Sequence, residues 1–562
     1  MTTDNPMGPR ADVSTSRSSR FWLALAAWRG LTGPYLAAWL AAAALLGAVT
    51  FWPALDNAFV YDDYAFIVDN PVVTQSGPWY RPWREPYWPR HRSADKLYRP
   101  LTIWSFRANT VLAGRGAPDP WSFHLVNLVL HGLACAAVAV GAYRLTGRAA
   151  AACIAGALFA THPVHTEAVV TAYGRAELLA GFFCAWLLAL HLRPVDEDRP
   201  RRVRFHVASS LLFLAALMSK EHALLVWPAL LLIDLAHRRR SARDPSSRRL
   251  STRAWFDRVL APEHVGFALA AAFFFCLRFS VFGQFYRLDN SRVRAWESPL
   301  AQASMVEHLL TPFRLLWLTL QCLVLPQRLC PTWSVPALSP ADRLAPDVLA
   351  GMVLMVILVG LTWFLWRRRS LSGAVLAGLL VVLAIPIQAL PLAHWFYAER
   401  WLYLPTVFIA MLIGSAAGRL RTPAAATGLA IALVLLPSSW QYTAKFADNE
   451  TMHREVVRRQ PDNFHGWRNL AAVLYFQGRY PEAILAANEL IRRFGPVSDA
   501  YMVQLKSYLE LGDGERALEA IDQYEYLRRH LPAPQLTEDR QRAQALIAES
   551  HRLGRGSLPA AD

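Results

Sequence analysis

The stretch VLAGMVLMVILVGLTWFLW, residues 348–366, decides the fold class, and it ends at three consecutive arginines, 367–369. It carries no charged residue, and about 20 apolar residues in a helix are enough to cross the hydrocarbon core of a bilayer. Similar apolar blocks occupy 37–48 and 149–160. The pattern predicts an all-α chain that crosses a membrane several times.

The composition of the whole chain agrees with a membrane protein. Hydrophobic residues make up 54% of the 562 positions and charged residues 18%, against about 25% charged in a soluble domain. The six cysteines lie in or beside apolar segments without CxxC or CxH spacing, so the sequence implies neither a zinc site nor a disulfide framework. No clear cleavage site follows the first apolar segment, which predicts a retained signal anchor.

The net charge of +16 comes largely from arginines between the apolar blocks. Short basic loops stay on the cytoplasmic side of a membrane, so this excess indicates orientation rather than a nucleic-acid partner. The clusters are Arg10–Arg29, Arg193–Arg204, Arg238–Arg258, Arg367–Arg369 and Arg419–Arg421.

These clusters predict a membrane domain at 35–442 after a cytoplasmic lead at 1–34. Placing every short Arg cluster inside gives eleven spans, an outer loop at 54–121 and an outer C-terminus. The apolar segment 315–325 is too short to cross, and counting it would place two Arg clusters outside. We therefore expect a surface or re-entrant helix there. The expected spans lie near 35–53, 122–144, 149–161, 168–192, 205–218, 222–236, 264–282, 347–366, 372–391, 401–418 and 423–440.

The remaining segment, 443–562, predicts an external helical repeat domain. Four residue pairs lie 34 positions apart: Trp467 and Tyr501, Leu474 and Tyr508, Gly478 and Gly512, and Ala483 and Ala517. That period, with Gly before a second helix and Ala within it, is typical of tetratricopeptide repeats. Two repeats with a preceding helix (445–459) and a trailing helix (535–553) make a short capped solenoid.

Ionisable residues from separate segments fall on the outer side of this topology. Charged groups at membrane depth are costly and usually functional, so their convergence indicates an outward-facing site. The residues are Asp62, Asp63, Arg99, His162, His165, Glu167, Arg175, Glu177, Lys220, Glu221, Glu399 and Arg400.

Each of these motifs also has a structural reading. An Asp-Asp pair after a span is often a helix cap or turn, and Lys220–Glu221 and Glu399–Arg400 are equally explained as ion pairs that hold helices together. The spacing from His162 through His165 to Glu167 suits a metal site, although capping and interhelical hydrogen bonds fit it better. His124, Asn127 and His131 share one face of a span and are expected to bond neighbouring helices.

Several motifs together resemble one known family. They are Phe59-Val-Tyr-Asp-Asp63, Tyr98-Arg-Pro-Leu-Thr102, Phe123-His-x-x-Asn127, His162-Pro-Val-His-Thr-Glu167, Gly174-Arg-x-Glu-Leu-Leu179, Ser219-Lys-Glu221 and Glu399-Arg-x-Leu-Tyr-x-Pro405. Over about 50–560 the chain is similar to the transmembrane and tetratricopeptide-repeat O-mannosyltransferases. This resemblance implies the GT-C glycosyltransferase class, whose members transfer a sugar with inversion from a polyprenyl phosphate to a protein hydroxyl at the outer membrane face.

The residue types suit that chemistry. A carboxylate can take the proton of an attacking hydroxyl, and the phosphate leaving group needs cations to stabilise its charge. We expect Asp62 to be the general base, with Asp63 orienting it or the sugar. Arg99, Arg175, Lys220 and Arg400 are candidates for the lipid phosphate, and the other outward residues are candidates for substrate contacts. A divalent cation bridged by Asp62 and Asp63 is the alternative.

The resemblance also implies which partners the protein has and where in the cell it lies. They are a polyprenyl-phosphate sugar donor (mannose by resemblance), a protein acceptor or partner on the repeats, and a bacterial inner membrane with the site and repeats in the periplasm. A membrane-anchored scaffold that gathers periplasmic proteins is the rival reading. A scaffold does not need Asp62, Arg99, Lys220 and Glu399 to meet in space. A transporter would show midplane polar residues and repeated halves, and the sequence shows neither.

Overall fold

The structure, a computed structural model, describes most of the chain. The described residues are 34–88, 97–114, 117–192, 199–241, 261–284, 299–390, 396–419, 424–529 and 536–552. Regular structure in these ranges is helical, and one isolated bridge, Pro336 to Asn463, pairs extended backbone. The all-α prediction is therefore confirmed for this part of the chain. The predicted cytoplasmic lead at 1–34 lies outside it except at its last residue.

A helix stands at each of the eleven segments expected to cross the membrane. These helices are α2 (Pro34–Thr50), α5 (Pro120–Thr146), α6 (Ala149–Thr161), α7 (Thr166–Val170) with α8 (Arg175–His191), α9 (Arg199–Ser219), α10 (Val226–Ser241), α12 (Pro262–Phe282), α14 (Pro346–Arg367), α15 (Leu371–Leu383), α16 (Tyr403–Ala417) and α17 (Ala424–Thr443).

Length and composition support fewer crossings than eleven. Four helical segments of the described residues are long and apolar enough to cross a membrane, and a bent pair, Pro163–Val170 with Arg175–His191, makes a fifth. Four shorter apolar helices accompany them, at Ala37–Thr50, Ala149–Thr161, Val203–Ser219 and Leu371–Leu383. These helices suggest an integral membrane protein, whereas the count of eleven spans and their orientation stay predictions.

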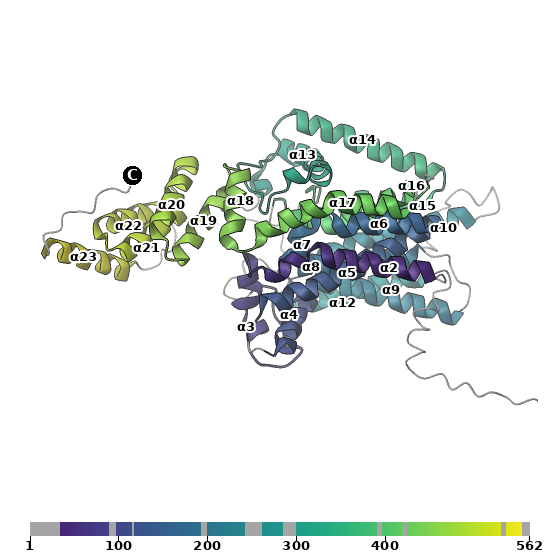
Figure 1. Ribbon diagram of the computed structural model, residues 1–562, viewed down its shortest axis with the longest axis horizontal. Helices are drawn as coiled ribbons and strands as arrows, with labels where there is room; N and C mark the ends of the chain where they lie inside the picture. The colour runs from purple at the N-terminus through teal and green to yellow at the C-terminus, as the bar shows by residue number, and fades with distance from the viewer. Residues whose placement is uncertain are drawn as a thin grey trace, which may run out of the picture.

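Helix α5 runs through the middle of the bundle (Figure 1), where it contacts α2, α6, α8 and α16. Its buried face is rich in small residues, among them Gly132, Ala134, Ala137 and Ala142. Small side chains let apolar helices approach closely in a membrane, where packing rather than hydrophobic transfer drives association. The bundle core is thus built by close helix packing around α5.

Two segments differ from the sequence prediction. The expected span 168–192 is broken, because α7 and α8 meet at an angle of 115°. At this break a Cβ on Gly174 would overlap the Ala168 carbonyl, so the tight turn requires glycine. The expected short helix at 315–325 is longer, since α13 spans Met305–Val324 from a Ser304–Glu307 capping box. Although it has 20 residues, α13 is not among the candidate spans.

The predicted outer loop 54–121 folds into short helices against one end of the bundle. These are η1 (Trp52–Asp56), η2 (Tyr64–Val68), α3 (Pro71–Thr74), η3 (Arg81–Arg84) and α4 (Pro100–Ala113). Residues of η2, α3 and α4 share a separate apolar core that includes Phe66, Tyr87 and Phe106 and that extends to Phe123 of α5 and Tyr173 of the α7–α8 turn. This shared core fixes the loop to the bundle next to Asp62 and Asp63.

The C-terminal helices extend away from the bundle as a stack (Figure 1). They are α18 (Asn449–Arg459), α19 (Phe464–Phe476), α20 (Tyr480–Phe494), α21 (Ser498–Leu511), α22 (Gly514–Arg528) and α23 (Thr537–Arg552). Helices α19 and α21 begin 34 residues apart, as do α20 and α22. Gly478 and Gly512 take positive φ at the turns. The 34-residue spacing of the helices agrees with the 34-residue period of the sequence. The tetratricopeptide assignment stays a prediction.

Candidate functional site

Helices α4, α7 and α8, which carry or border several of the predicted site residues, reach the end of the bundle nearest the repeat helices (Figure 1). The other predicted site residues come from the first loop, from η5 (Pro163–His165) before α7, from η6 (Glu221–Leu225) after α9, and from η10 (Glu399–Leu402) before α16. Six of the twelve predicted residues make ion pairs with one another, and these pairs join segments far apart in sequence.

Arg99 and Glu221 form the outer pair of this network. The Arg99 Nε donates to Glu221 Oε2 at 3.0 Å, and its Nη2 donates to Oε1 at 2.7 Å. Two parallel hydrogen bonds of this kind are the preferred geometry of a guanidinium with a carboxylate. The guanidinium also lies 4.8 Å from the centre of the Tyr87 ring. Although burial raises it, the Arg99 charge holds the pKa of Glu221 well below its usual range. The Glu221 side chain is still 39% exposed.

Glu177 and Glu167 form the inner part of the network. Glu177 pairs with Lys220, and its Oε1 lies 3.3 Å from Arg400 Nε. Arg400 also pairs with Glu167 through Nη1, while its backbone N–H donates to Glu167 Oε2 at 2.8 Å. Both carboxylate side chains are at most 3% exposed. Since water is largely excluded, each charge here depends on its partner.

Asp62 and Asp63 play different parts. Asp63 is fully buried, and its two oxygens accept the backbone N–H groups of Val60 at 3.0 Å and Tyr173 at 2.6 Å. Burial raises the pKa of Asp63 to about 7, although these hydrogen bonds lower it. Asp62 is half-buried, and its charge acts on both Arg400 and Tyr173. Asp63 therefore fixes the turn, and Asp62 lies close enough to Arg400 for its charge to act on that side chain.

Residues at the start of the repeat helices form hydrogen bonds with the backbone just before Asp62. Tyr61 has φ of 49°, a left-handed conformation that is unfavourable for a bulky residue. Its N–H donates to Asn449 Oδ1 of α18 at 2.7 Å, and the Ala58 N–H donates to the Ala447 carbonyl at 2.8 Å. Strained backbone that neighbouring contacts hold in place is typical of functional sites.

Arg175 does not join the network. It is fully buried between the rings of Phe106 and Phe123, with its guanidinium carbon 5.1 and 4.9 Å from their centres. Its Nε donates to Asn127 Oδ1 at 2.8 Å and its Nη2 to the Phe123 carbonyl at 2.7 Å. Asn127 in turn donates to two carbonyls of the α7–α8 turn, as its predicted interhelical role requires. Through these contacts Arg175 links helices α4, α5 and α8.

The two histidines and Glu399 also bond within the protein. His162 Nε2 lies 2.9 Å from the Leu323 carbonyl, and His165 Nε2 lies 2.8 Å from Thr406 Oγ1. Glu399 accepts hydrogen bonds from the Cys330 N–H at 2.6 Å, Trp333 Nε1 at 3.2 Å and Tyr442 Oη at 2.9 Å. The expected meeting thus includes Asp62, Arg99 and Lys220, whereas Glu399 binds the segment before α14.

The network contains residues that the sequence did not single out. Tyr173 lies under Arg400, 5.2 Å from its guanidinium carbon, and its hydroxyl reaches Glu167 Oε1 at 3.4 Å. His222 follows Glu221, and burial together with the charge of Lys220 lowers its pKa to about 3. A neutral imidazole beside Arg99 and Lys220 adds no positive charge. The position of His222 directly after the Lys220–Glu221 motif was the available signal.

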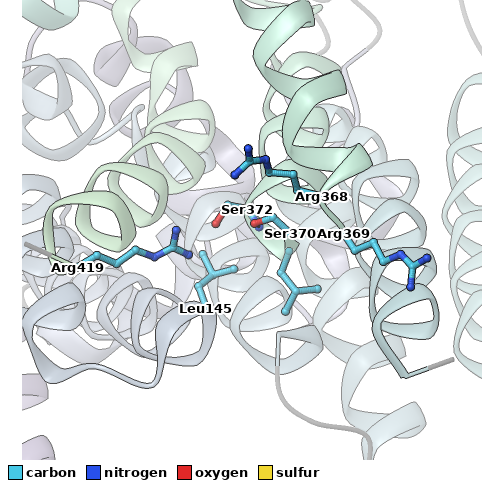
Figure 2. Close-up of a pocket in the computed structure, with 7 residues that line it drawn as sticks. Leu145, Arg368, Arg369, Ser370, Ser372 and Arg419 are labelled. Atoms are coloured by element: carbon cyan, nitrogen blue, oxygen red, sulfur yellow. The ribbon is translucent and has the colours of Figure 1, made fainter. Parts of the chain in front are cut away.

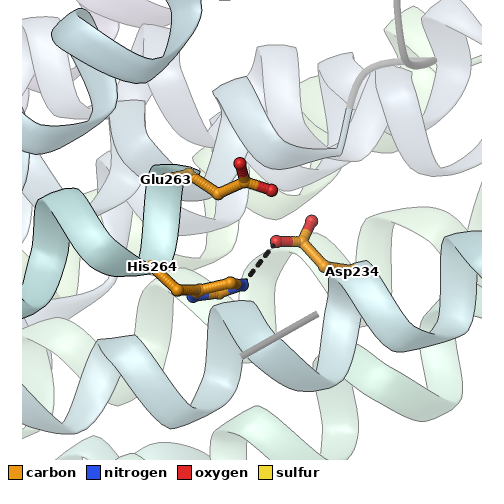
Figure 3. Close-up of side chains that lie close together, drawn as sticks. All are labelled: Asp234, Glu263 and His264. Atoms are coloured by element: carbon orange, nitrogen blue, oxygen red, sulfur yellow. Dashed lines mark ion pairs between the residues drawn. The ribbon is translucent and has the colours of Figure 1, made fainter. Parts of the chain in front are cut away.

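The residues most suited to metal binding lie elsewhere. Among the described residues, one group of three metal-ligand types comes within 4.8 Å: Asp234, Glu263 and His264 (Figure 3). Trp227 Nε1 donates to His264 Nδ1 at 3.1 Å, so neutral His264 carries its hydrogen on Nε2, which faces Asp234 Oδ2 at 3.1 Å. That tautomer offers no lone pair to an ion, and neither His264 Nε2 nor Asp234 Oδ2 makes a hydrogen bond within the described part of the chain. The group is therefore a close polar contact between α10 and α12.

Comparison with known proteins supports the sequence resemblance. The chain is 28% identical over 503 residues to human protein O-mannosyl-transferase TMTC1, which covers 79% of this chain and 54% of that protein. It is 27% identical over 465 residues to the Caenorhabditis elegans protein O-mannosyl-transferase F38B6.6, covering 78% and 60%. Drosophila melanogaster Tmtc2 is 39% identical over 186 residues, covering 32% and 20%. The resemblance to these O-mannosyltransferases is confirmed.

The similarity covers only part of the length of these relatives. The chain spans at most 60% of the length of these three relatives, and no protein-family model matches it. Among solved structures, the chain is similar to ArnT from Cupriavidus metallidurans (TM-score 0.40, 13% identity, covering 92% of this chain and 78% of that one). It is also similar to the oligosaccharyltransferase AglB from Archaeoglobus fulgidus (TM-score 0.39, 14% identity, covering 82% and 60%).

Proposed function

We propose that the chain is a membrane glycosyltransferase of the GT-C type. It takes a sugar, mannose by analogy with its relatives, from a polyprenyl phosphate and gives it with inversion to a hydroxyl of an extracytoplasmic acceptor, a serine or threonine of a protein. The observation that carries this proposal is the meeting of Arg99, Lys220 and Arg400 with Asp62 at one end of the bundle.

Asp62 is the proposed general base. An attacking hydroxyl must lose its proton as the bond to the anomeric carbon forms, and a carboxylate within hydrogen-bond reach can accept it. Asp62 is half-buried, whereas both oxygens of Asp63 are occupied by backbone N–H groups. In this proposal Asp63 stabilises the turn and Asp62 accepts the proton.

Arg99 is the proposed first contact for the donor phosphate. Its partner Glu221 has a side chain that is 39% exposed, whereas Glu167 and Glu177 are almost fully buried. Phosphate offers the same two-oxygen geometry as a carboxylate. It can replace Glu221 on Arg99 without opening the inner pairs, and Lys220 and Arg400 then add positive charge behind it.

The repeat helices are the proposed acceptor or partner surface. They enclose a pocket of about 180 Å³ lined by residues that include Arg468, Asn469, Asp499 and Tyr524. The first of these helices, α18, bonds to the backbone beside Asp62. A bound protein would thus lie on the same structural unit that holds the catalytic turn. A scaffold alone does not require Asp62, Arg99 and Lys220 to lie at the same end of the bundle.

Transfer of labelled mannose from polyprenyl-phosphate mannose, in membranes that contain the full chain, tests the proposal. We expect Asp62→Asn to lower transfer by about 10²-fold or more at unchanged protein level. Asp69→Asn, an exposed carboxylate of the same loop, is the matched control and should retain activity. Full transfer by Asp62→Asn would overturn the assignment.

Chelation separates this mechanism from the metal-dependent alternative. Three cations already face the proposed phosphate position, so we expect EDTA to leave transfer unchanged. Loss of transfer with EDTA and recovery with Mn²⁺ would instead assign Asp62 to a divalent cation.

A further inference from the structure

A basic pocket lies at the other end of the bundle. Its volume is about 330 Å³, and its lining comprises Leu145, Arg368, Arg369, Ser370, Leu371, Ser372 and Arg419 (Figure 2). The guanidinium groups of Arg368 and Arg419 flank the two serines (Figure 2). Four segments build the pocket: the ends of α5, α14 and α16 and the start of α15.

The arginines of this pocket have no acidic partner within the described part of the chain. Arg368 lies over the Phe364 ring, 4.4 Å from its centre, and none of Arg368, Arg369 and Arg419 takes part in an ion pair there. The first turn of α15 adds the positive end of a helix dipole, and Ser370 caps that helix by accepting from the Ser372 N–H. The pocket therefore has a surplus of positive charge and hydroxyl groups.

Helix lengths place this pocket about one membrane thickness from the candidate site. On α5, Asn127 binds Arg175 near the site and Leu145 lines the pocket; eighteen residues of helix rise about 27 Å. On the η10–α16 segment, Arg400 lies in the network and Arg419 follows the far end. A hydrocarbon core is about 30 Å thick, so the pocket lies at the level of the opposite headgroups.

The neighbouring helix indicates that the pocket opens beside lipid. Along α14 the side chains of Val353, Val356, Trp363 and Phe364 are 46–72% exposed, and only Val348 and Gly351 of that helix are buried. Apolar side chains left uncovered on a candidate span face the acyl chains, and tryptophan favours the interface. A ligand in this pocket can therefore keep its tails beside α14.

We propose that this pocket binds the phosphate of an anionic phospholipid in the leaflet opposite the candidate site, which the positive-inside rule makes the cytoplasmic one. Guanidinium groups pair with phosphate oxygens in two-point geometry, and basic pockets between spans on the cytoplasmic side are known binding places for acidic headgroups. The lipid packs between α14 and α16. This inference is independent of the proposed sugar transfer.

Native mass spectrometry of the delipidated full chain tests the proposal with phosphatidylglycerol as the probe. We expect one phosphatidylglycerol molecule to bind more tightly than phosphatidylethanolamine. The double variant Arg368→Gln/Arg419→Gln should weaken that binding about thirtyfold, from the effect per basic residue near a membrane surface. Arg367→Gln is the control, because Arg367 lies at the same end but outside the pocket lining.

Inorganic phosphate distinguishes a lipid from a soluble ligand. We expect 10 mM phosphate to leave the thermal midpoint of the detergent-solubilised chain unchanged, while phosphatidylglycerol raises the midpoint of the wild type and not of the double variant. Equal protection by phosphate would overturn the assignment to a lipid. Equal binding of both phospholipids, or equal weakening by Arg367→Gln, would overturn the pocket as the site.

Discussion

The two ends of the helical bundle carry charge in opposite ways. At the end with Asp62, the cations Arg99, Lys220 and Arg400 are each paired with carboxylates from other segments. At the other end, Arg368, Arg369 and Arg419 line an open pocket, and no ion pair of the described residues includes them.

This difference separates two uses of arginine in one membrane protein. Paired and buried cations cost desolvation energy that only well-placed partners offset. Their presence therefore indicates that this arrangement of segments has a function. Exposed arginines at short loops orient the chain at little structural cost. The first kind defines a candidate site for chemistry, and the second a surface for headgroups.

The largest expected effect is on stability at the paired end. Glu177→Gln leaves Lys220 and Arg400 with less compensation inside the protein, and breaking a buried pair costs about 3–5 kcal/mol. Arg419→Gln, at the unpaired end, should change stability by no more than about 0.5 kcal/mol. Thermal unfolding in detergent measures both. Equal losses for the two variants would contradict the difference between the ends.

Arg99→Lys should weaken donor binding. Lysine keeps the charge but loses the two-point geometry that Arg99 uses with Glu221 and would use with phosphate. We expect the KM for the polyprenyl-phosphate donor to rise about 10- to 100-fold, as for the loss of a charge-assisted hydrogen bond. Arg84→Lys, in the same loop over Tyr80, is the control. An unchanged KM would remove Arg99 from the donor site.

Asp63 gives stability a predictable pH dependence. Its folded pKa is about 7 against 3.8 in the unfolded chain, so between these values the folded chain holds a proton that the unfolded chain has lost. The contribution is therefore complete below about pH 4 and is lost as pH rises to about 7. The thermal midpoint of wild type relative to Asp63→Asn should fall from pH 5 to pH 8.

The Asn side chain does not titrate, so its own cost is a constant offset between the two proteins. It has one oxygen for the two N–H groups that Asp63 accepts, and an unsatisfied buried donor costs about 1–3 kcal/mol. A difference that stays flat from pH 5 to pH 8 would show that Asp63 is ionised throughout this range and would contradict its raised pKa.

The smallest expected effect concerns the contact between the repeat helices and the catalytic turn. Asn449→Ala removes the acceptor for the Tyr61 N–H, and a hydrogen bond of this kind contributes about 0.5–1.5 kcal/mol. We expect kcat to fall about 3- to 10-fold with little change in KM, and Asn449→Asp to restore it.

A second amide tests whether this effect is specific. Asn488 of α20 bonds to Gln504 at 2.6 Å within the repeats. Asn488→Ala should therefore leave kcat unchanged. An equal fall in kcat would show a general effect of repeat stability.

Sequence patterns predicted the helical class and most of the network. Apolar blocks between arginine clusters mark the helices, because charge is excluded from the membrane core. The pairing partners were not predictable in the same way. Adjacent residues such as Lys220 and Glu221 project in different directions, so Lys220 pairs with Glu177 and Glu221 with Arg99. Contacts between distant segments depend on packing that no local pattern encodes.

Arg175 and α13 show the same limit. The sequence placed Arg175 with the phosphate-binding cations because it is a cation on the outer side of the predicted topology, yet the aromatic rings of Phe106 and Phe123 enclose it. The apolar segment 315–325 is only the second half of α13, whose first half has exposed Met305 and Leu309. Apolar periodicity identified the buried half and gave no sign of the cap at Ser304.

A structure of the chain with bound polyprenyl phosphate tests the central claim most directly. The account predicts that the phosphate contacts Arg99, that Glu221 has left the Arg99 guanidinium, and that Asp62 faces the side from which an acceptor hydroxyl would attack. A polyprenyl phosphate bound only at the Arg368–Arg419 pocket, with the Arg99–Glu221 pair intact, would contradict it.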